Sequence, residues 1–171
     1  MTGWLEQDYS FWSGFEMQYA KLRKTDGNPI HVKGIDPKIV IEPLLRDVQD
    51  KPNEEINVFC FSSIPKLTIR LIEYNDCETT LYDEALNIIN SVFSVGDTQI
   101  KKPVDDILKD AVILSKKLSE NFNFVRVDWM VYKNKLYFEE MTFTPHSGFN
   151  GSINPDFNLE LGKLLTIGGN G

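Results

Sequence analysis

Four polar side chains that could bind a metal ion and a phosphate group recur at alternate positions in two neighbouring segments. Arg126 and Asp128 are two residues apart in the first segment, and Glu140 and Thr142 are two residues apart in the second. Carboxylates are ligands of hard cations such as Mg²⁺, which uses one or two of them together with phosphate oxygens. A nearby guanidinium can neutralise charge that develops on a transferred phosphoryl group. This combination of side chains indicates phosphoryl chemistry.

Both segments have the alternating pattern of β-strands. In residues 124–132 and 136–144, polar and apolar side chains alternate, so each segment has two different faces. A short turn at 133–135 joins them into a predicted hairpin. Because a slip of one residue moves every side chain to the other face, the length of the turn decides which residues face each other.

A turn of three residues separates polar from apolar side chains most cleanly. It places Asp128 opposite Glu140 and Arg126 opposite Thr142, whereas a turn of two residues would place Glu140 opposite Val127. We therefore predict the three-residue turn.

The same register predicts the positions of the neighbouring apolar residues. Leu136 and Phe138 are expected on the face of Glu140, and Val131 is expected opposite Tyr137 on the reverse face.

In this register the two carboxylates of Asp128 and Glu140 approach within roughly 5 Å, which is destabilising unless a positive charge lies between them. Arg126 could supply that charge. A divalent cation bound by the two carboxylates and the Thr142 oxygen could supply it as well. The alternative is a solvated strand face whose charges pair with Arg126 or the turn lysines, and spacing alone does not decide between these interpretations.

The local sequence around these residues resembles a known family. Residues 124–129 (FVRVDW) and 137–149 (YFEEMTFTPHSGF) are similar to the C-terminal signature of the TupA-like ATP-grasp family, associated with cell-surface polysaccharide and teichuronopeptide biosynthesis. The resemblance extends over roughly the whole chain, with further matches at 37–45, 57–61, 82–83 and 154–155, and it is most specific between Phe124 and Phe149. It implies an α+β lobe with a mainly antiparallel sheet backed by helices, and a Mg-ATP-dependent carboxylate-amine ligase that uses ATP and Mg²⁺.

The resemblance also implies a role for each polar residue. Arg126 matches the phosphate-stabilising arginine, Asp128 and Glu140 match the Mg²⁺ ligands, and Thr142 stands where asparagine commonly completes the set. The implied partners are an amine donor and a carboxylate acceptor, either a small molecule or glycan-linked.

Two further sets of residues follow from the resemblance. The first corresponds to the hinge strand that contacts adenine, and its members are Glu42, Pro43, Leu44 and Leu45. The second corresponds to the acceptor-substrate loop, and its members are Pro145, His146, Ser147 and Gly148. An ordinary turn with a solvated histidine is the alternative for the second set.

Three departures from the family weaken the case for independent catalysis. The family's early segment, whose lysine grips the ATP phosphates, has no counterpart, so we expect the N-terminal lobe to be absent from this chain or supplied by a partner chain. Asn57 stands where relatives usually have lysine, and 73–80 is acidic where relatives carry basic residues. Two other functions stay open: a non-catalytic binding or scaffold module, and a metal-dependent hydrolase or glycosidase that uses Asp128 and Glu140.

Composition limits the choice of partners. With 171 residues, a net charge of −7 and a pI near 4.9, the chain has the size of one domain and lacks the basic surface that nucleic acids require. It contains no apolar run long enough for a membrane span, and we expect a cytoplasmic protein. Cys60 lies in an apolar run, so we expect a reduced, structural thiol.

The organisation along the chain is predicted as follows. An aromatic segment and loop occupy 1–36, the lobe occupies 37–167, and a disordered tail occupies 168–171. Within the lobe we predict strands at 38–45, 56–61 and 66–72, with a hairpin loop at 62–65 between the last two. A polar loop is predicted at 73–80, and 81–92 fits neither a strand nor a helix clearly. Helices are predicted at 101–120 and 154–165. The first of these helices should begin at Pro103, with Asp105 and Asp106 in its first turn.

Overall fold

The fold is described for one part of the chain. The computed structural model describes residues 53–73, 77–90, 98–145 and 153–165, all within the unit Leu44–Gly171. The predicted aromatic segment, the strand 38–45 and the tail lie outside the described residues, so those predictions stay untested.

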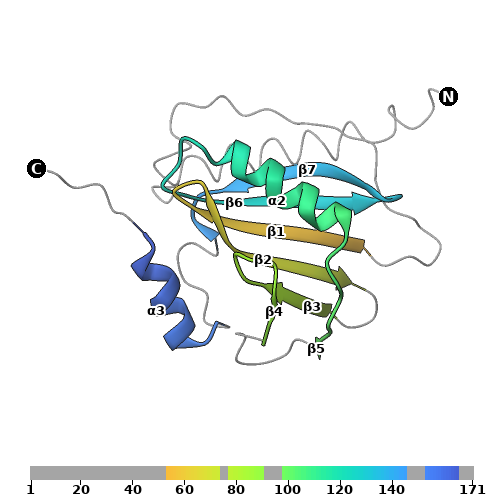
Figure 1. The fold of residues 1–171 in the computed structure, drawn as a ribbon, viewed down its shortest axis with the longest axis horizontal. Helices are drawn as coiled ribbons and strands as arrows, with labels where there is room; N and C mark the ends of the chain where they lie inside the picture. The colour runs from red at the N-terminus through yellow and green to blue at the C-terminus, as the bar shows by residue number, and fades with distance from the viewer. Residues whose placement is uncertain (1–52, 74–76, 91–97, 146–152, 166–171) are drawn as a thin grey trace, which may run out of the picture. The chain divides into compact units, whose positions relative to one another are not determined.

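The described residues form a mainly antiparallel sheet with two helices (Figure 1). The strands are β1 (Asn53–Phe61), β2 (Ile64–Glu73), β3 (Cys77–Tyr82), β4 (Ile88–Ile89), β5 (Thr98–Gln99), β6 (Phe124–Tyr132) and β7 (Lys135–Thr142). The helices are α2 (Asp106–Leu118) and α3 (Pro155–Lys163). The sheet order is β4-β3-β2-β1-β6-β7, and β5 pairs in parallel with β3. The predicted α+β fold class is confirmed.

The first hairpin is tighter than the sequence predicted. β1 and β2 are joined by a turn of two residues, Ser62 and Ser63, with φ angles of 48° and 67°. Left-handed residues at both turn positions match the right-handed twist of the flanking strands. The prediction of a polar loop over 73–80 was wrong at 77–80, because strand β3 pairs with β2 and buries Thr79 and Thr80 in the sheet. Residues 74–76 lie outside the described residues.

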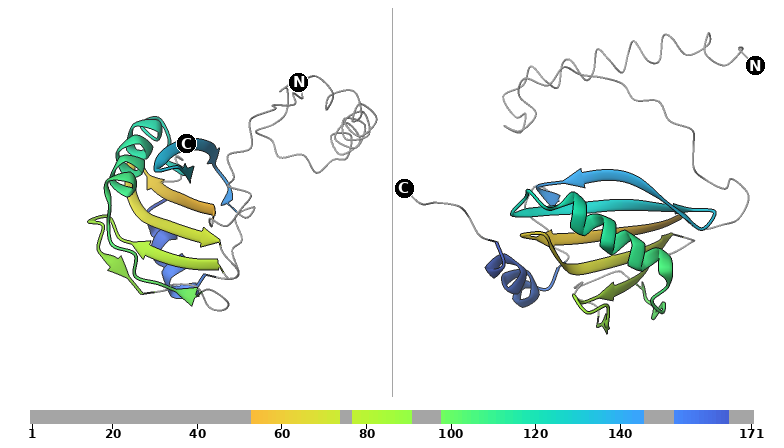
Figure 2. Two further views of the ribbon diagram at one scale, coloured as in Figure 1. Left: turned by 90° about the vertical axis from the view of Figure 1, so that its right-hand side faces the viewer. Right: turned by 45° about the horizontal axis from the view of Figure 1, so that its top comes forward.

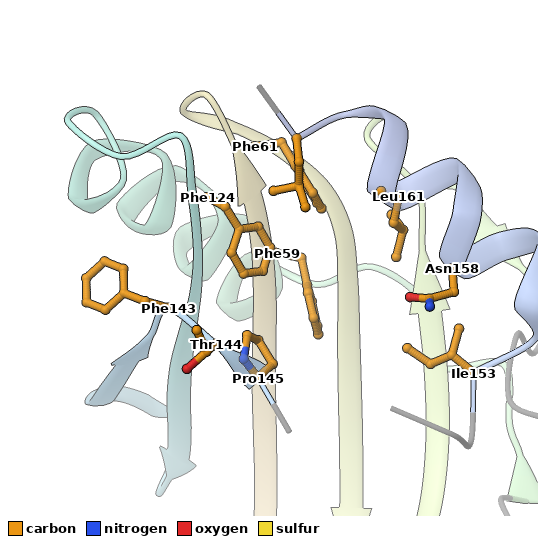
Figure 3. Close-up of a pocket in the computed structure, with 11 residues that line it drawn as sticks. Phe59, Phe61, Phe124, Phe143, Thr144, Pro145, Ile153, Asn158 and Leu161 are labelled. Carbon is orange, nitrogen blue, oxygen red and sulfur yellow. The ribbon is translucent and has the colours of Figure 1, made fainter. Parts of the chain in front are cut away.

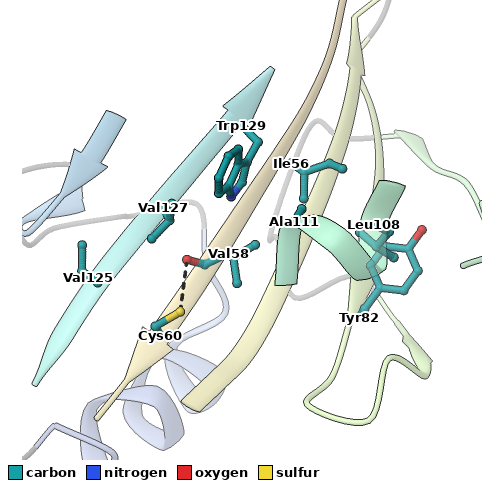
Figure 4. Close-up of a cluster of buried hydrophobic side chains, with 9 residues drawn as sticks. All are labelled: Ile56, Val58, Cys60, Tyr82, Leu108, Ala111, Val125, Val127 and Trp129. Atoms are coloured by element: carbon teal, nitrogen blue, oxygen red, sulfur yellow. Dashed lines mark hydrogen bonds between the residues drawn. The ribbon is translucent and has the colours of Figure 1, made fainter. Parts of the chain in front are cut away.

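The main core lies between the sheet and α2 (Figure 4). Alternate residues of β1 and β6 point toward the helix and are fully buried: Ile56, Val58, Cys60, Val125 and Val127. Cys60 is a free, buried thiol, as predicted. The indole of the neighbouring Trp129 donates a hydrogen bond to Ser115 Oγ at 2.8 Å, so its polar atom is satisfied inside the core.

Helix α2 begins later than predicted. Its N-cap is Asp105, whose Oδ1 accepts a hydrogen bond from the Leu108 amide at 2.9 Å. Asp106 is the first helical residue, so Pro103 precedes the helix. Leu108 and Ala111 are buried on the face of the helix toward the sheet, Ile107 and Val112 pack against the core at partial exposure, and Leu118 is exposed.

Helix α3 packs against the opposite face of the sheet, as the left view of Figure 2 shows. Its N-cap Asn154 accepts hydrogen bonds from the amides of Asp156 and Phe157 at 2.9 and 3.3 Å. Phe157 and Leu161 pack against a second cluster of buried residues, formed by Leu67, Ile69 and Leu81. The prediction of a short C-terminal helix is confirmed. Neither described helix is long and apolar enough to cross a membrane.

An ion network around the buried Arg70 joins the sheet to the start of α2. Arg70 of β2 is only 2% exposed and lies on the helix side of the sheet. Its guanidinium pairs with Glu54 of β1, and its Nη1 lies 2.8 Å from Asp105 Oδ2. Lys102 Nζ adds a contact of 3.1 Å to Glu54. Two carboxylates and two cations therefore meet beneath the N-terminus of the helix.

Candidate active site on the β6–β7 hairpin

The hairpin brings the four predicted polar residues together. Arg126 pairs with Thr142 and Asp128 pairs with Glu140 across β6 and β7, as the sequence predicted. Antiparallel partners point to the same side of a sheet. All four side chains therefore lie on the face opposite α2.

This register arises in a way that the sequence analysis did not foresee. The turn contains only two residues, Lys133 and Asn134, with φ angles of 49° and 60°. On its own it would put Glu140 opposite Val127, but the pairing shifts between Asp128 and Trp129. A β-bulge at Glu139 therefore restores the polar pairs.

The bulge also overturns two predictions about apolar residues. Phe138 pairs with Trp129, and the two rings meet edge-on with their centroids 5.9 Å apart. Phe138 therefore lies on the helix side of the sheet and away from Glu140. Leu136 is opposite Val131 and packs against the main core, so Tyr137 does not face Val131. Each prediction was wrong because side-chain direction reverses at the extra residue.

Arg126 and Asp128 form the tightest contact in the site. Arg126 Nε donates hydrogen bonds to Asp128 Oδ1 and Oδ2 at 2.8 and 3.0 Å, and Nη2 donates to Oδ2 at 2.7 Å. Such two-pronged pairs fix both side chains and are stronger than neutral hydrogen bonds. The arginine is thus held along the strand, within reach of both carboxylates.

Glu140 and Thr142 complete the cluster from β7. Thr142 Oγ1 donates to Glu140 Oε1 at 2.9 Å, and Arg126 Nη2 lies 3.4 Å from the same oxygen. The side chain of Glu140 is 59% exposed, whereas that of Asp128 is only 5% exposed. One carboxylate is therefore fixed within the sheet and the other can adjust to a ligand.

Burial raises the pKa of Asp128; the Arg126 guanidinium partly opposes this change, and Glu140 adds to it. The pKa of Glu139 is raised by burial and then by the charges of Asp128 and Glu140. Loss of solvation is the largest cause of both pKa shifts, and repulsion between the neighbouring carboxylates adds to it. A bound cation would relieve that repulsion.

The donor set fits Mg²⁺. In the part of the chain that the structure describes, no three or more His, Cys, Asp or Glu side chains gather into a metal-binding group. Asp128 and Glu140 supply two carboxylates, and Thr142 supplies a hydroxyl. Mg²⁺ commonly binds through one or two carboxylates and completes its shell with water and substrate phosphates, whereas a closed zinc site needs four protein ligands.

The comparison with protein families shows the family of this chain. The family model described as TupA-like ATPgrasp matches residues 17–166, most of the chain. The chain belongs to the TupA-like ATP-grasp family. Neither a curated protein nor a solved structure matches it. ATP-grasp enzymes generally use ATP and Mg²⁺, in keeping with two carboxylates beside an arginine.

Several residues assigned by resemblance cannot be located. Glu42, Pro43, Leu44 and Leu45 lie outside the described residues, and so do His146, Ser147 and Gly148. Pro145 is described and lies just beyond the end of β7. Their roles remain predictions.

Asn57 is the one departure from the family pattern whose position bears on the site. It lies directly opposite Asp128 on β1, on the same face of the sheet. A lysine there would place a second cation beside the carboxylates. The TupA-like chain has an uncharged amide instead, which leaves the cluster more negative.

An apolar pocket that was not predicted from the sequence lies on this face (Figure 3). Its volume is about 510 Å³. Phenylalanines and aliphatic residues form most of its lining, including Phe59, Phe61, Phe124, Phe143, Ile153 and Leu161. One signal for the pocket was available in the sequence. By strand alternation Phe124 shares a face with Arg126, and Phe59 shares a face with Asn57, so each aromatic ring lies on a polar strand face.

Proposed function

We propose that this TupA-like ATP-grasp chain carries the C-terminal lobe of a cytoplasmic, Mg-ATP-dependent carboxylate-amine ligase in cell-surface polysaccharide biosynthesis. The observation that carries the proposal is the gathering of Arg126, Asp128, Glu140 and Thr142 on one face of one hairpin. Family membership supports the ATP-dependent part of the proposal. The glycan-related acceptor follows from the biosynthetic role associated with this family.

In this proposal the acidic residues and the arginine have different roles. Asp128, Glu140 and Thr142 would hold the metal ion through their oxygens. When bound, Mg²⁺ neutralises the phosphate oxygens of ATP and helps to align the phosphoryl group that is transferred. Arg126 lies beside the carboxylates and is placed to stabilise the charge that develops on this group.

The proposed reaction has two steps. A carboxylate oxygen of the acceptor attacks the γ-phosphorus of ATP, the bond to the β-phosphate oxygen breaks, and ADP leaves. The amine nitrogen then attacks the carbonyl carbon of the acyl phosphate, loses a proton and expels phosphate. The product is an amide, and one ATP is converted to ADP and phosphate.

The charge balance favours the metal complex of ATP over the free nucleotide. One guanidinium faces two carboxylates in the cluster, so an anion without a cation would meet net repulsion. The remaining contacts are proposed from family resemblance. Residues Glu42, Pro43, Leu44 and Leu45 would contact adenine, and the loop of Pro145, His146, Ser147 and Gly148 would contact the acceptor.

Isothermal calorimetry with Mg-ATP tests the metal assignment. Asp128→Asn and Glu140→Gln should each weaken Mg-dependent nucleotide binding by about 100-fold or more, because each removes one of two ligand carboxylates. Glu120→Gln is a suitable control, since it removes the same charge from an exposed residue after α2. Circular dichroism of each variant would check that the fold is retained.

Two results would contradict the proposal. If both site variants bound Mg-ATP as tightly as the parent, the metal assignment would fail. If the parent bound no Mg-ATP even with an N-terminal lobe supplied in trans, a non-catalytic scaffold module would be the better interpretation.

A further inference from the structure

The apolar pocket lies on the arginine side of the candidate site, away from the carboxylate pair. Phe124 precedes Arg126 by two residues on β6, and Arg126 precedes Asp128 by two, so all three point to one face. Each such step covers about 6.5 Å along a strand. A ligand in the pocket is therefore separated from the proposed metal site by the guanidinium.

Phe59 joins the pocket to the charged cluster. Its ring lines the pocket, and the Arg126 Cζ atom lies 6.0 Å from the ring centroid. The hydrogen bonds to Asp128 use Nε and Nη2 of the guanidinium, so Nη1 makes none of these bonds. A group that enters the pocket could consequently place an anionic end beside Arg126.

The pocket lining selects against hydroxyl-rich ligands. Of the described residues that line it, Thr144 and Asn158 are the ones with hydrogen-bonding side chains. The centroids of the Phe61 and Phe124 rings lie 4.9 Å apart, and the ring planes are tilted by 56°. Aromatic surface of both residues lines the pocket and is available for stacking. A sugar ring buried here would leave hydroxyls without partners, and each would cost free energy. An apolar ring would not incur that cost.

We infer that this pocket binds an aromatic ring of the acceptor, whose carboxylate lies beside Arg126. The inference rests on the proposed ligase function and adds a substrate class to it: an aryl-substituted carboxylic acid rather than a bare sugar acid. The volume of about 510 Å³ falls within the usual range for small-molecule pockets. The apolar lining supplies affinity, and the guanidinium supplies orientation.

Gly162 offers a way to fill the pocket with little disturbance. It lies in α3 and lines the pocket, and a Cβ atom added there would meet no atom within 4 Å. Gly162→Leu should therefore occupy part of the space. Gly162→Ala is the matched control, because it makes the same change in backbone freedom with a much smaller side chain.

The experiment is an NMR titration of the full chain in buffer containing Mg²⁺, with 3-phenylpropanoate, glucuronate and benzyl alcohol as probes. Phenylpropanoate and glucuronate carry the same charge, so their difference reports on the ring. We expect phenylpropanoate to bind at least about tenfold more tightly than either other probe. Nuclear Overhauser contacts should connect its ring to the side chains of Phe124 and Leu161.

The variants sharpen the result. Gly162→Leu should weaken phenylpropanoate binding about tenfold or more, while Gly162→Ala should stay within about twofold of the parent. Equal affinity for glucuronate, contacts to residues elsewhere, or equal binding by Gly162→Leu and Gly162→Ala would each overturn the inference.

Parallel titrations with Mg-ATP separate the two proposals. If Mg-ATP binds and phenylpropanoate does not, the substrate class is wrong and the ligase proposal stands. If phenylpropanoate binds at these side chains and Mg-ATP does not, the pocket is an aryl-acid site, but its assignment as a ligase acceptor site fails.

Discussion

Glu139 and Glu140 have the same side chain and adjacent positions, yet the bulge gives them different surroundings. Glu140 is the residue paired with Asp128, and it accepts a hydrogen bond from Thr142. Glu139 is the extra residue, and its pKa is raised by burial and by the two neighbouring carboxylates. Only Glu140 is therefore assigned to the metal.

This difference gives a prediction for a single residue. Glu139→Gln should leave Mg-dependent nucleotide binding within about threefold of the parent, because it removes a repelled charge and no proposed ligand. Calorimetry beside Glu140→Gln provides the comparison. Equal losses in the two variants would show that both glutamates bind the metal.

At the residue scale, the sequence was sufficient to find the polar cluster. Arg126, Asp128, Glu140 and Thr142 were identified by type and by their two-residue spacing, which reflects the strand period. Phe59 as a neighbour of Arg126 could not be found in this way. That contact depends on the pairing of β1 with β6, which local spacing does not encode.

At the scale of elements, the hairpin illustrates how a correct pairing can follow from an incorrect turn. The sequence predicted three turn residues, and the structure has two residues and a bulge. Because Glu139 and Glu140 are both acidic, alternation does not reveal which of them is the extra residue. The same limit applies to α2, since Asp105 and Asp106 are equally acceptable at a cap by type.

The cap of α2 gives a pH-dependent prediction. Burial is the largest single influence on the pKa of Asp105 and would raise it. The hydrogen bond from the Leu108 amide and the nearby Arg70 guanidinium together outweigh burial, so the pKa is lowered. The stabilising contribution is thus complete above the unfolded-state pKa of about 3.9 and is lost as the pH falls through the lower folded-state value.

Asp105→Ala should therefore reduce the free energy of unfolding by about 1–2 kcal/mol at neutral pH, and the difference from the parent should shrink below about pH 4. Urea unfolding at pH 7 and pH 3 measures both values. Asp106→Ala is the control, because Asp106 is 94% exposed and pairs only with Lys109 among the described contacts. A constant difference at both pH values would exclude the cap carboxylate as its source.

At the scale of the whole described unit, Arg70 joins three elements. It sits in β2 and pairs with Glu54 of β1 and with the cap residue of α2. Removing one partner of a buried ion network leaves charges without compensation. Stability at this point depends on all members being present.

Arg70→Met should lower the free energy of unfolding by about 3–5 kcal/mol, because Glu54 and Asp105 would lose their buried partner. Chemical denaturation is the measurement. Lys66→Met, at the exposed pair with Glu84, should change stability by less than about 1 kcal/mol. A similar small effect at both positions would contradict the role given to Arg70.

The α+β fold class could be predicted from the sequence, but the spatial arrangement of the strands and helices could not. Alternation indicated the strands, the start signals at Pro103, Asp105 and Asp106 indicated helix α2, and family resemblance indicated the α+β lobe. The order of the strands and the pocket between β1, β6 and α3 depend on contacts between distant segments. Such contacts leave no periodic trace in one sequence.

The central pairing of β1 with β6 has a consequence for how this unit folds. Each of the hairpins β1–β2 and β6–β7 joins segments that are adjacent in the chain, whereas β1 and β6 are separated by β2 to β5 and α2. Closing so long a loop costs entropy before any contact compensates for it. The β6–β7 hairpin can therefore assemble early, but the pairing of β1 with β6 should limit the folding rate.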